Sequence, residues 1–330
     1  MTTPLKRVLS GMQPSGLMHL GNYLGALENW KALQTHYDCY FFVADWHALS
    51  TNYADTSRVR EFVREMLIDW LAAGIDPRES IVFIQSHVPQ VMELFTILSM
   101  VTPLGKLTDL PTFKEKVRMQ PNNVNLGLVG YPVLMTADIV LYKADLVPVG
   151  IDQASHVEFA RETVRSFNFR YNTDVLKEPD IKLTEVPKVI GTDGQQKMSK
   201  SLNNHIELAL TPEETEKVVM TMVTDPARKR RSDPGNPDVC NVFSMHKVFS
   251  SPEEVAMVNL ECRRAGIGCV DCKKLFAKNL NAHLAPFRER RAALAQNPDD
   301  IWDALRDGER RARVIAEQTM AEVRDAIGLP

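Results

Sequence analysis

The sequence predicts an α/β fold with a doubly wound parallel sheet, followed by a helical domain. Four short apolar runs rich in Val, Phe and Ile have the composition of buried parallel strands, and amphipathic helical patterns separate them. After about residue 203 the strand patterns cease and only amphipathic helices follow. We therefore expect a Rossmann-type domain over residues 1–202 and a helical domain over residues 203–330.

The expected strands span residues 6–12, 39–45, 80–86 and 146–150. In the first domain the expected helices are 19–36, 57–73, 89–100, 127–143 and 152–167. In the second domain they are 212–223, 252–265, 272–296 and 308–326. A ligand of such a sheet binds beyond the carboxyl ends of the strands. Residues 11–16, 45–47, 85–86 and 150–153 fall at that edge.

Length and composition indicate a cytoplasmic enzyme. With 330 residues, 44% apolar and 25% charged, the chain can bury the cores of two domains. The first residues lack the apolar stretch of a signal peptide, and no apolar run is long enough to span a bilayer, so no membrane partner is expected. A net charge of −3 gives no overall attraction to nucleic acid, so any RNA contact must come from local basic patches.

Two short segments predict a nucleotide site. Residues 14–22 (PSGLMHLGN) join an expected strand to an expected helix, where helix-initial N–H groups attract phosphates and glycines allow close approach. Residues 197–201 (KMSKS) follow a loop-forming GTDG sequence and place two lysines within reach of a triphosphate. Either segment alone is a weak signal, because the first can be only a helix cap and the second only a solvated loop. Their order and setting together favour one ATP site.

A third segment, around residues 131–138, indicates which hydrogen-bonding group a second substrate would carry. Tyr131, Met135 and Asp138 stand at helical spacing and share one helix face. A carboxylate on an otherwise apolar face is costly to bury unless it has a hydrogen-bond donor. The single N–H of an indole is a suitable donor, and an internal arginine or a nearby cap would satisfy Asp138 equally well. Residue types alone leave both interpretations open.

These segments, together with residues 11–16, 45–48 and 113–116, resemble bacterial tryptophanyl-tRNA synthetases over nearly the whole chain. Those proteins are class I aminoacyl-tRNA synthetases, whose HIGH-like and KMSKS motifs flank ATP. The resemblance implies a tryptophan–tRNA ligase that converts L-tryptophan and ATP to tryptophanyl-adenylate and pyrophosphate, and then transfers the tryptophanyl group to the 3′ end of tRNA(Trp). It also implies Mg²⁺ as a cofactor and a homodimer, with the apolar helices that begin at Pro89 and Gly127 as candidate interface.

By that resemblance the site residues can be named. The catalytic residues would be His19, Asn22, Lys116, Lys197 and Lys200. The ATP-binding residues would be Gln13, Ser15, Gly21, Asn22, Gly150, Asp152, Lys197, Met198, Ser199 and Lys200. The tryptophan-binding residues would be Gln13, His47, Tyr131, Met135, Asp138, Val147, Val149 and Gln153. One departure is Ile151, which stands where many relatives carry Glu and leaves one polar contact near the ribose in doubt.

Four of the five cysteines predict a metal site, whereas Cys39 falls in an expected strand and is expected to be inert. Thiols that lie close together in a cytosolic chain favour a soft metal, and an iron–sulfur cluster and zinc each accept four thiolates. The spacing is similar to that of a subset of tryptophanyl-tRNA synthetases that carry a 4Fe–4S cluster, with a first gap one residue shorter. We therefore expect a 4Fe–4S cluster ahead of zinc or of no metal. The expected ligands are Cys240, Cys262, Cys269 and Cys272.

Basic residues near these cysteines are candidate tRNA contacts. Arg228, Arg230 and Arg231 lie in a loop bounded by proline and glycine, and Lys273 and Lys274 follow the last cysteine of the four. The arginines of residues 288–291 and 310–313 are as compatible with solvated helix faces as with RNA binding. Three other functions stay open: a tyrosyl-type synthetase of the same fold, a non-catalytic RNA-binding or metal-sensing paralogue, and a small-molecule nucleotidyltransferase.

Overall fold

The structure, a computed structural model, describes residues 4–183 and 189–330; the side chains of Asp152 and Asp300 lie outside this description. The chain divides into two compact units. The first, here called the sheet unit, comprises Met1–Ser15, Asn29–Glu185 and Asn297–Pro330. The second, the helical unit, comprises Gly16–Glu28 and Val186–Gln296. Each unit is described by itself below.

The sheet unit is built on five parallel strands in the order β3-β2-β1-β4-β5. Val8 of β1 lies opposite Cys39 on one side and Leu146 on the other, so the order of the chain reverses between β1 and β4. This arrangement confirms the doubly wound sheet and its four expected strands. The fifth strand, β5, was not predicted. The bounds are β1 Arg7–Met12, β2 Asp38–Val43, β3 Ser80–Ile84, β4 Leu146–Val149 and β5 Asp180–Leu183.

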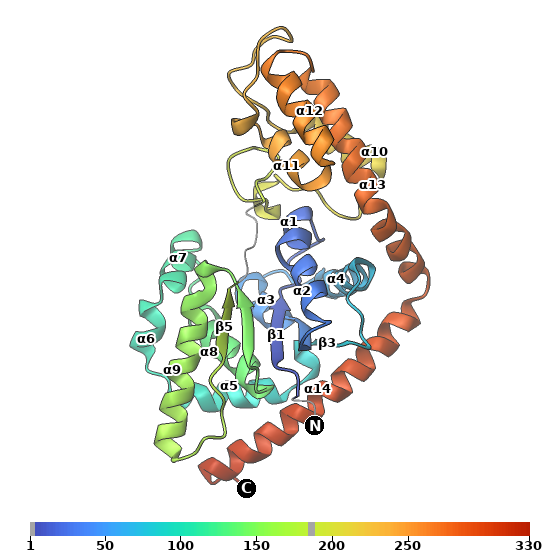
Figure 1. Cartoon of the computed structure of the whole chain (residues 1–330). Helices are drawn as coiled ribbons and strands as arrows, with labels where there is room; N and C mark the ends of the chain where they lie inside the picture. Colours follow the sequence, from blue (N-terminus) through green and yellow to red (C-terminus); the bar gives the residue numbers. More distant parts are fainter. Residues whose placement is uncertain (1–3, 184–188) are drawn as a thin grey trace. The chain divides into compact units, whose positions relative to one another are not determined.

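Helices flank this sheet on both faces (Figure 1). Expected helices appear as α2, α4, α5, α8 and α9, whereas α3, α6 and α7 were not predicted. Asn125 caps the amino-terminal end of α8, and its side chain accepts from the Leu128 N–H. The helical elements of this unit are α2 (Glu28–Leu33), α3 (Asp45–Asn52), α4 (Val59–Ala73), η2 (Gln85–His87), α5 (Gln90–Val101), α6 (Leu104–Asp109), α7 (Pro111–Met119), α8 (Leu126–Leu141), η3 (Ile151–Gln153), α9 (Ala154–Tyr171) and α14 (Pro298–Ile327).

The last helix, α14, packs along the edge strand β3 of the sheet unit. A Cβ on Gly308 would lie 2.0 Å from the Val82 carbonyl oxygen, so only glycine permits this approach. The contact covers a strand edge that would otherwise be free to pair with another chain. It also places α14 with the sheet, although the pattern at 308–326 had been assigned to the second domain.

The helical unit is assembled around the long helix α13. Phe276, Leu280 and Leu284 of α13 are buried in its core. Thr211 and Ser251 begin two helices with capping boxes and a proline at the first position. Of its elements, α11 was not predicted. The bounds are α1 (Leu20–Asn22), η1 (Tyr23–Leu27), η4 (Lys200–Leu202), α10 (Pro212–Thr221), η5 (Pro237–Val239), α11 (Asn241–Phe249), α12 (Pro252–Arg263) and α13 (Cys269–Gln296).

The division into units differs from the expected boundary at residues 202 and 203. The segment Gly16–Glu28 belongs to the helical unit because its backbone pairs with the chain that follows the lysine motif. The Leu20 N–H donates to the Ile206 carbonyl at 3.0 Å, and the Leu208 N–H donates to the Met18 carbonyl at 3.0 Å. Such pairing between distant segments leaves no local pattern in the sequence. Among the helices of the described ranges, none has the length and apolar character that a membrane crossing requires.

Candidate active site

Residues 16–22 of the first predicted nucleotide-binding segment lie beside the second segment within the helical unit. His19 and Glu207 form an antiparallel bridge, so this part of the turn is held against the chain that follows KMSKS. A Cβ on Gly16 would lie 3.0 Å from Cδ and 3.2 Å from Nζ of Lys200, which places the lysine side chain directly on this glycine. Gly16 also has a φ of +135°, a conformation that side chains rarely adopt. The structure thus brings the early and late motifs together.

The lysine segment is held in shape by one asparagine, Asn204. Its Oδ1 accepts from the Ser199 N–H at 2.8 Å, and its Nδ2 donates to Asp193 Oδ2 at 2.9 Å. A Cβ on Gly191 would lie 2.2 Å from Asn204 Nδ2, so this position also requires glycine. Sequence analysis missed Asn204, although its place just after KMSKS was a usable signal. The side chains of Lys197 and Lys200 start from a loop whose backbone is therefore ordered.

His19 is nearly buried, with 7% of its surface exposed. Burial, and then the charges of Lys200, His205 and Lys197, lower its pKa to about 4, so the ring is neutral at neutral pH. Its Nδ1 has no hydrogen-bond partner among the described residues. Asn22 Oδ1 accepts from the His19 N–H at 3.1 Å and fixes the start of the turn. A buried ring nitrogen without a protein partner is suited to a ligand oxygen.

The predicted recognition carboxylate, Asp138, lies on α8 in the sheet unit and is 2% exposed. Its Oδ2 lies 2.8 Å from His47 Nε2, and Gln85 Nε2 lies 2.9 Å from each of its two oxygens. Burial raises the pKa of this carboxyl although both partners act to lower it. The pairing that residue types left open is therefore realised, with a histidine and a glutamine in place of an arginine. Because a carboxylate accepts about four hydrogen bonds, Oδ1 retains room for one more donor.

Gln85, which sequence analysis did not assign, fixes the geometry of this carboxylate. Its Oε1 accepts from the Trp46 N–H at 3.2 Å and is 3.4 Å from the His47 nitrogen. The amide oxygen is thereby held toward the backbone, so the NH₂ group faces Asp138. The available signal was its position as the first residue after β3, at the edge where the ligand is expected.

Tyr131 shares the α8 face with Asp138 and Met135, as predicted. Its Oη lies 3.0 Å from Thr112 Oγ1 and 2.9 Å from His156 Nε2. Lys116 Nζ lies 3.5 Å from the centroid of the Tyr131 ring, a cation–π contact. Burial lowers the pKa of Lys116. Lys116 is thus placed beside a residue predicted to hold the amino acid.

The remaining predicted residues of the sheet unit lie on β4 or shortly after β1 and β4, except for Met135 on α8. Val147 is buried, and Met135 and Val149 pack against the core at its border. Gln153 Oε1 accepts from His156 Nδ1 at 2.8 Å, next to Gly150, which precedes η3. The other two in this group, Gln13 and Ser15, follow β1, and the Ser15 N–H donates to the Gln13 carbonyl at 2.8 Å. Ile151 is 79% exposed. The side chain of Asp152 is outside the described residues.

The four predicted metal ligands gather in the helical unit. Arg228 Nη1 lies 3.8 Å from Cys269 Sγ and 4.0 Å from Cys262 Sγ. Burial raises the pKa of Cys272 to about 12, and the nearby Cys240, Cys262 and Cys269 add to the rise. Within the described ranges, however, no group of three or more His, Cys, Asp or Glu side chains is arranged to hold a metal ion. The four thiols are suitable ligands for a soft metal, but they are not arranged as a metal site in this structure. The iron–sulfur cluster therefore stays a prediction.

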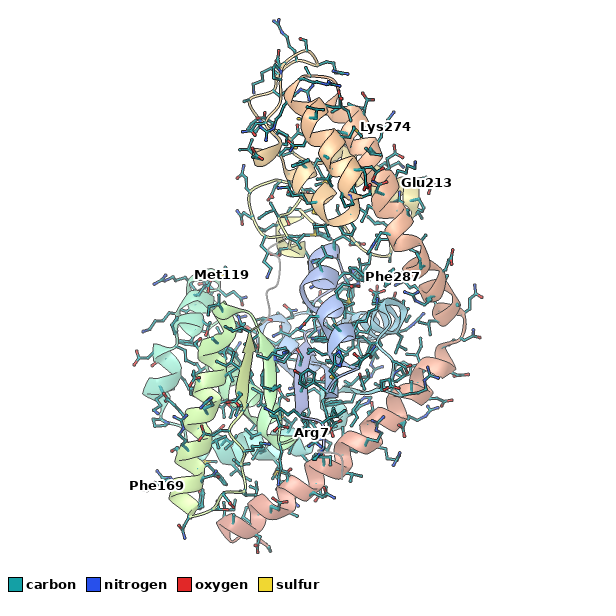
Figure 2. All side chains as sticks on the ribbon, in the orientation of Figure 1. Arg7, Met119, Phe169, Glu213, Lys274 and Phe287 are labelled. Carbon is teal, nitrogen blue, oxygen red and sulfur yellow. The ribbon has the colours of Figure 1, made fainter. Side chains whose placement is uncertain are left out.

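Two arginines of the basic loop have a structural use in addition to the predicted one, which stays a prediction. Arg228 Nη2 donates to the Arg231 and Ile267 carbonyls at 2.9 Å, and Arg231 Nη2 donates to the Gly266 carbonyl at 3.0 Å. These two side chains fasten the loop to the turn that precedes Cys269. Arg230 is exposed. On α13, Lys273 Nζ donates to the Met220 carbonyl at 2.8 Å, and Lys274 is exposed and lies on the same helix (Figure 2).

Comparison with known proteins agrees with this geometry. The family described as "tRNA synthetases class I (W and Y)" matches residues 2–285. Tryptophan–tRNA ligase of Thermotoga maritima is 46% identical over 328 residues, which are 98% of this chain and 99% of that protein. The corresponding ligase of Aquifex aeolicus is 40% identical over 396 residues, covering 98% and 100% of the two chains.

Solved structures give the same result. Tryptophanyl-tRNA synthetase from Campylobacter jejuni, complexed with ADP and tryptophan, superimposes with a TM-score of 0.90 at 34% identity and covers 98% of this chain and 100% of that one. A tyrosyl-tRNA synthetase from Archaeoglobus fulgidus, at 20% identity and a TM-score of 0.66, shares the fold alone. The chain therefore belongs to the family of class I tRNA synthetases for tryptophan (W) and tyrosine (Y).

Proposed function

We propose that this chain is a tryptophan–tRNA ligase. It activates L-tryptophan with ATP to give tryptophanyl-adenylate and pyrophosphate, and then transfers the tryptophanyl group to the 3′ end of tRNA(Trp). The observation that carries the proposal is the contact between the two motifs, in which the Lys200 side chain covers Gly16 of the phosphate-binding turn. The 46% identity to a tryptophan–tRNA ligase across the whole chain supports it independently.

The activation step needs positioning and charge stabilisation more than covalent chemistry by the protein. The tryptophan carboxylate oxygen attacks the α-phosphorus, and the bond from that phosphorus to the pyrophosphate oxygen breaks. We propose that Lys197 and Lys200 stabilise the negative charge on the departing pyrophosphate, with Lys116 as a third cation. Neutral His19 and Asn22 contact the phosphates. Mg²⁺, when bound with ATP, neutralises phosphate charge.

The other nucleotide contacts are assigned by residue. Gln13, Ser15, Gly21, Gly150, Asp152, Met198 and Ser199 bind ATP beside the catalytic residues. In the second step the terminal ribose hydroxyl of the tRNA attacks the adenylate carbonyl, and AMP leaves.

Asp138 selects the amino acid. Its remaining acceptor position accepts the indole N–H, and a phenylalanine side chain would leave that position unpaired in a buried site. Met135, Val147 and Val149 line the ring pocket together with His47. Tyr131, Gln153 and Gln13 hold the ammonium and carboxylate end. A buried acceptor of this kind discriminates against a ring without a donor more strongly than an apolar wall would.

The proposal is tested by charging a tRNA(Trp) transcript with radiolabelled tryptophan, tyrosine or phenylalanine in the presence of ATP and Mg²⁺. We expect tryptophan alone to be transferred efficiently. Lys200→Ala should remove the activity, while Lys217→Ala, a change at an exposed lysine of α10, should leave it intact. Preferential charging with tyrosine, or full activity of Lys200→Ala, would contradict the assignment.

We further propose that Cys240, Cys262, Cys269 and Cys272 bind a 4Fe–4S cluster, with zinc as the less favoured metal. The support is the four-thiol donor set and the single guanidinium that contacts two of the thiols across distant parts of the chain. Protein purified without air should contain iron and sulfide in equal amounts and absorb visible light. Protein with neither iron nor sulfide, or with zinc alone, would exclude the cluster.

We propose Arg230 and Lys274 as tRNA contacts, since both are exposed, and we retain Arg228, Arg231 and Lys273 as residues that order the same surface. Arg230→Ala should raise the KM for tRNA at an unchanged KM for tryptophan, because a lost phosphate contact weakens RNA binding alone. Equal KM values for tRNA in the variant and the parent protein would remove Arg230 from this surface.

A second copy of the chain is the proposed partner of the apolar surface on α5 and α8. A hollow of about 410 Å³ there is lined by residues that include Trp46, Met92 and Phe95, and Leu126 at the start of α8 is 84% exposed. Sedimentation velocity should show a dimer that Leu126→Asp weakens. Leu329→Asp, a matched change at an exposed leucine near the carboxyl terminus, should not. A monomeric parent protein would contradict the proposal.

A further inference from the structure

A buried histidine outside the assigned site connects two residues that hold the amino acid. His156 lies on α9, is 4% exposed, and has partners on both ring nitrogens. Nδ1 lies 2.8 Å from Gln153 Oε1. Nε2 lies 2.6 Å from Thr112 Oγ1 and 2.9 Å from Tyr131 Oη, and the two hydroxyl oxygens are 3.0 Å apart.

The donors and acceptors of this group fix the direction of its hydrogen bonds. Gln153 Oε1 can only accept, so His156 Nδ1 donates to it, and Nε2 is the ring nitrogen that faces the two hydroxyls. The Tyr131 hydroxyl donates to Thr112 Oγ1 at 3.0 Å, and Thr112, the nearer hydroxyl to Nε2, links the two rings. The Tyr131 proton is thus directed into this group, toward Thr112 and His156.

One end of this group is the Tyr131 oxygen. With its proton directed toward Thr112, Oη presents only lone pairs on its other side. An acceptor is what an α-ammonium group requires, because an ammonium has only hydrogens to donate. If the Tyr131 proton pointed outward instead, it would oppose the ammonium.

We propose that His156 is a positioning residue that keeps Tyr131 as a hydrogen-bond acceptor for the α-ammonium group of the amino acid. The inference rests on the proposed function, because it assumes that an amino acid binds at Tyr131. Thr112 acts as the relay between the two rings. Neither residue touches the substrate. The effect of Thr112 is confined to the ammonium and does not extend to the indole or the carboxylate, whereas His156 also contacts Gln153.

Three ligands separate this role from a general structural one. L-tryptophan has the indole, the ammonium and the carboxylate; tryptamine lacks the carboxylate, and indole-3-propionate lacks the ammonium. Calorimetric titration of the full-length protein measures the affinity for each. In Thr112→Val, we expect tryptophan and tryptamine to bind about 10- to 100-fold more weakly, the loss of a hydrogen bond to a charged group, with little change for indole-3-propionate. His156→Phe should weaken the binding of tryptophan and tryptamine at least as much.

Thr112→Ser keeps the relay hydroxyl and should bind all three ligands as the parent protein does. Thr163→Val on α9, whose hydroxyl bonds to its own helix at the Phe159 carbonyl, is the matched control and should also be neutral. Equal losses for all three ligands in Thr112→Val would overturn the positioning role. Since this substitution is nearly isosteric, it tests the role even if His156→Phe does not fold. A parent protein that binds none of the three ligands would overturn the proposed function and this inference together.

Discussion

Replacing Asp138 with asparagine tests how the side chain of the amino acid is recognised. The carboxylate accepts from His47 at 2.8 Å and from Gln85 at 2.9 Å, and Oδ1 is the acceptor that we propose for the indole N–H. Asparagine keeps the shape of the side chain but removes its charge and one acceptor atom. A hydrogen bond to a charged group contributes about 1.5–3 kcal/mol, so the KM for tryptophan should rise about 10- to 100-fold.

The assay is ATP–pyrophosphate exchange with the concentration of each substrate varied in turn. The KM for ATP serves as the internal control and should stay within about twofold, because Asp138 is predicted to contact only the indole. A tryptophan analogue in which sulfur replaces the indole N–H sharpens the test. The parent protein should discriminate strongly against this analogue and Asp138→Asn only weakly. Equal rises in both KM values, or undiminished discrimination by the variant, would refute the assignment.

Three further predictions concern the elements that support the site. Gln85→Leu removes the donors that hold Asp138, so the KM for tryptophan should rise while that for ATP stays constant; the reverse pattern in exchange kinetics would count against it. Gly191→Ala places a Cβ 2.2 Å from Asn204 Nδ2 and should displace the lysine loop. The variant should be less stable by about 1–3 kcal/mol and have a higher KM for ATP. An unchanged melting temperature would contradict the close contact between Gly191 and Asn204. The pKa of His19, lowered from 6.5 to about 4, makes a contribution to stability that is complete above pH 6.5 and is lost as the pH falls toward 4. This contribution is about 2 kcal/mol after solvent screening. Between pH 6.5 and 4 the free energy of unfolding of His19→Asn should therefore change less with pH than that of the parent protein. Parallel plots of the two free energies against pH would exclude this contribution of His19.

The strands at the centre of the sheet were predictable because burial on both faces leaves a continuous apolar run. Residues 39–43 of β2, for example, are buried throughout. The edge strand β5 has the sequence DIKL, half of it charged, and its residues are exposed or half-buried, so no apolar run marks it. Short helices such as α3 and α7 also lack the several turns over which a period of 3.6 residues becomes visible.

Motifs and helical spacing predicted the residues that would face a ligand. They did not identify the residues behind them. Gln85 and His156 act through side chains that lie far away in the sequence, and a single polar residue has no periodicity to reveal such a partner. Arg228 and Arg231, which are predicted tRNA contacts, also bond through their guanidinium groups to carbonyl oxygens of a turn more than 30 residues away, and the sequence of the loop does not reveal this structural use.

The central claim is that the two motif segments and Asp138 serve one reaction, the activation of tryptophan. Its most direct test is the incorporation of labelled pyrophosphate into ATP, measured with each of the twenty amino acids in turn and without tRNA. The account predicts exchange that depends on tryptophan and is lost in Lys200→Ala. Exchange supported by a different amino acid, or none with any of them, would contradict it.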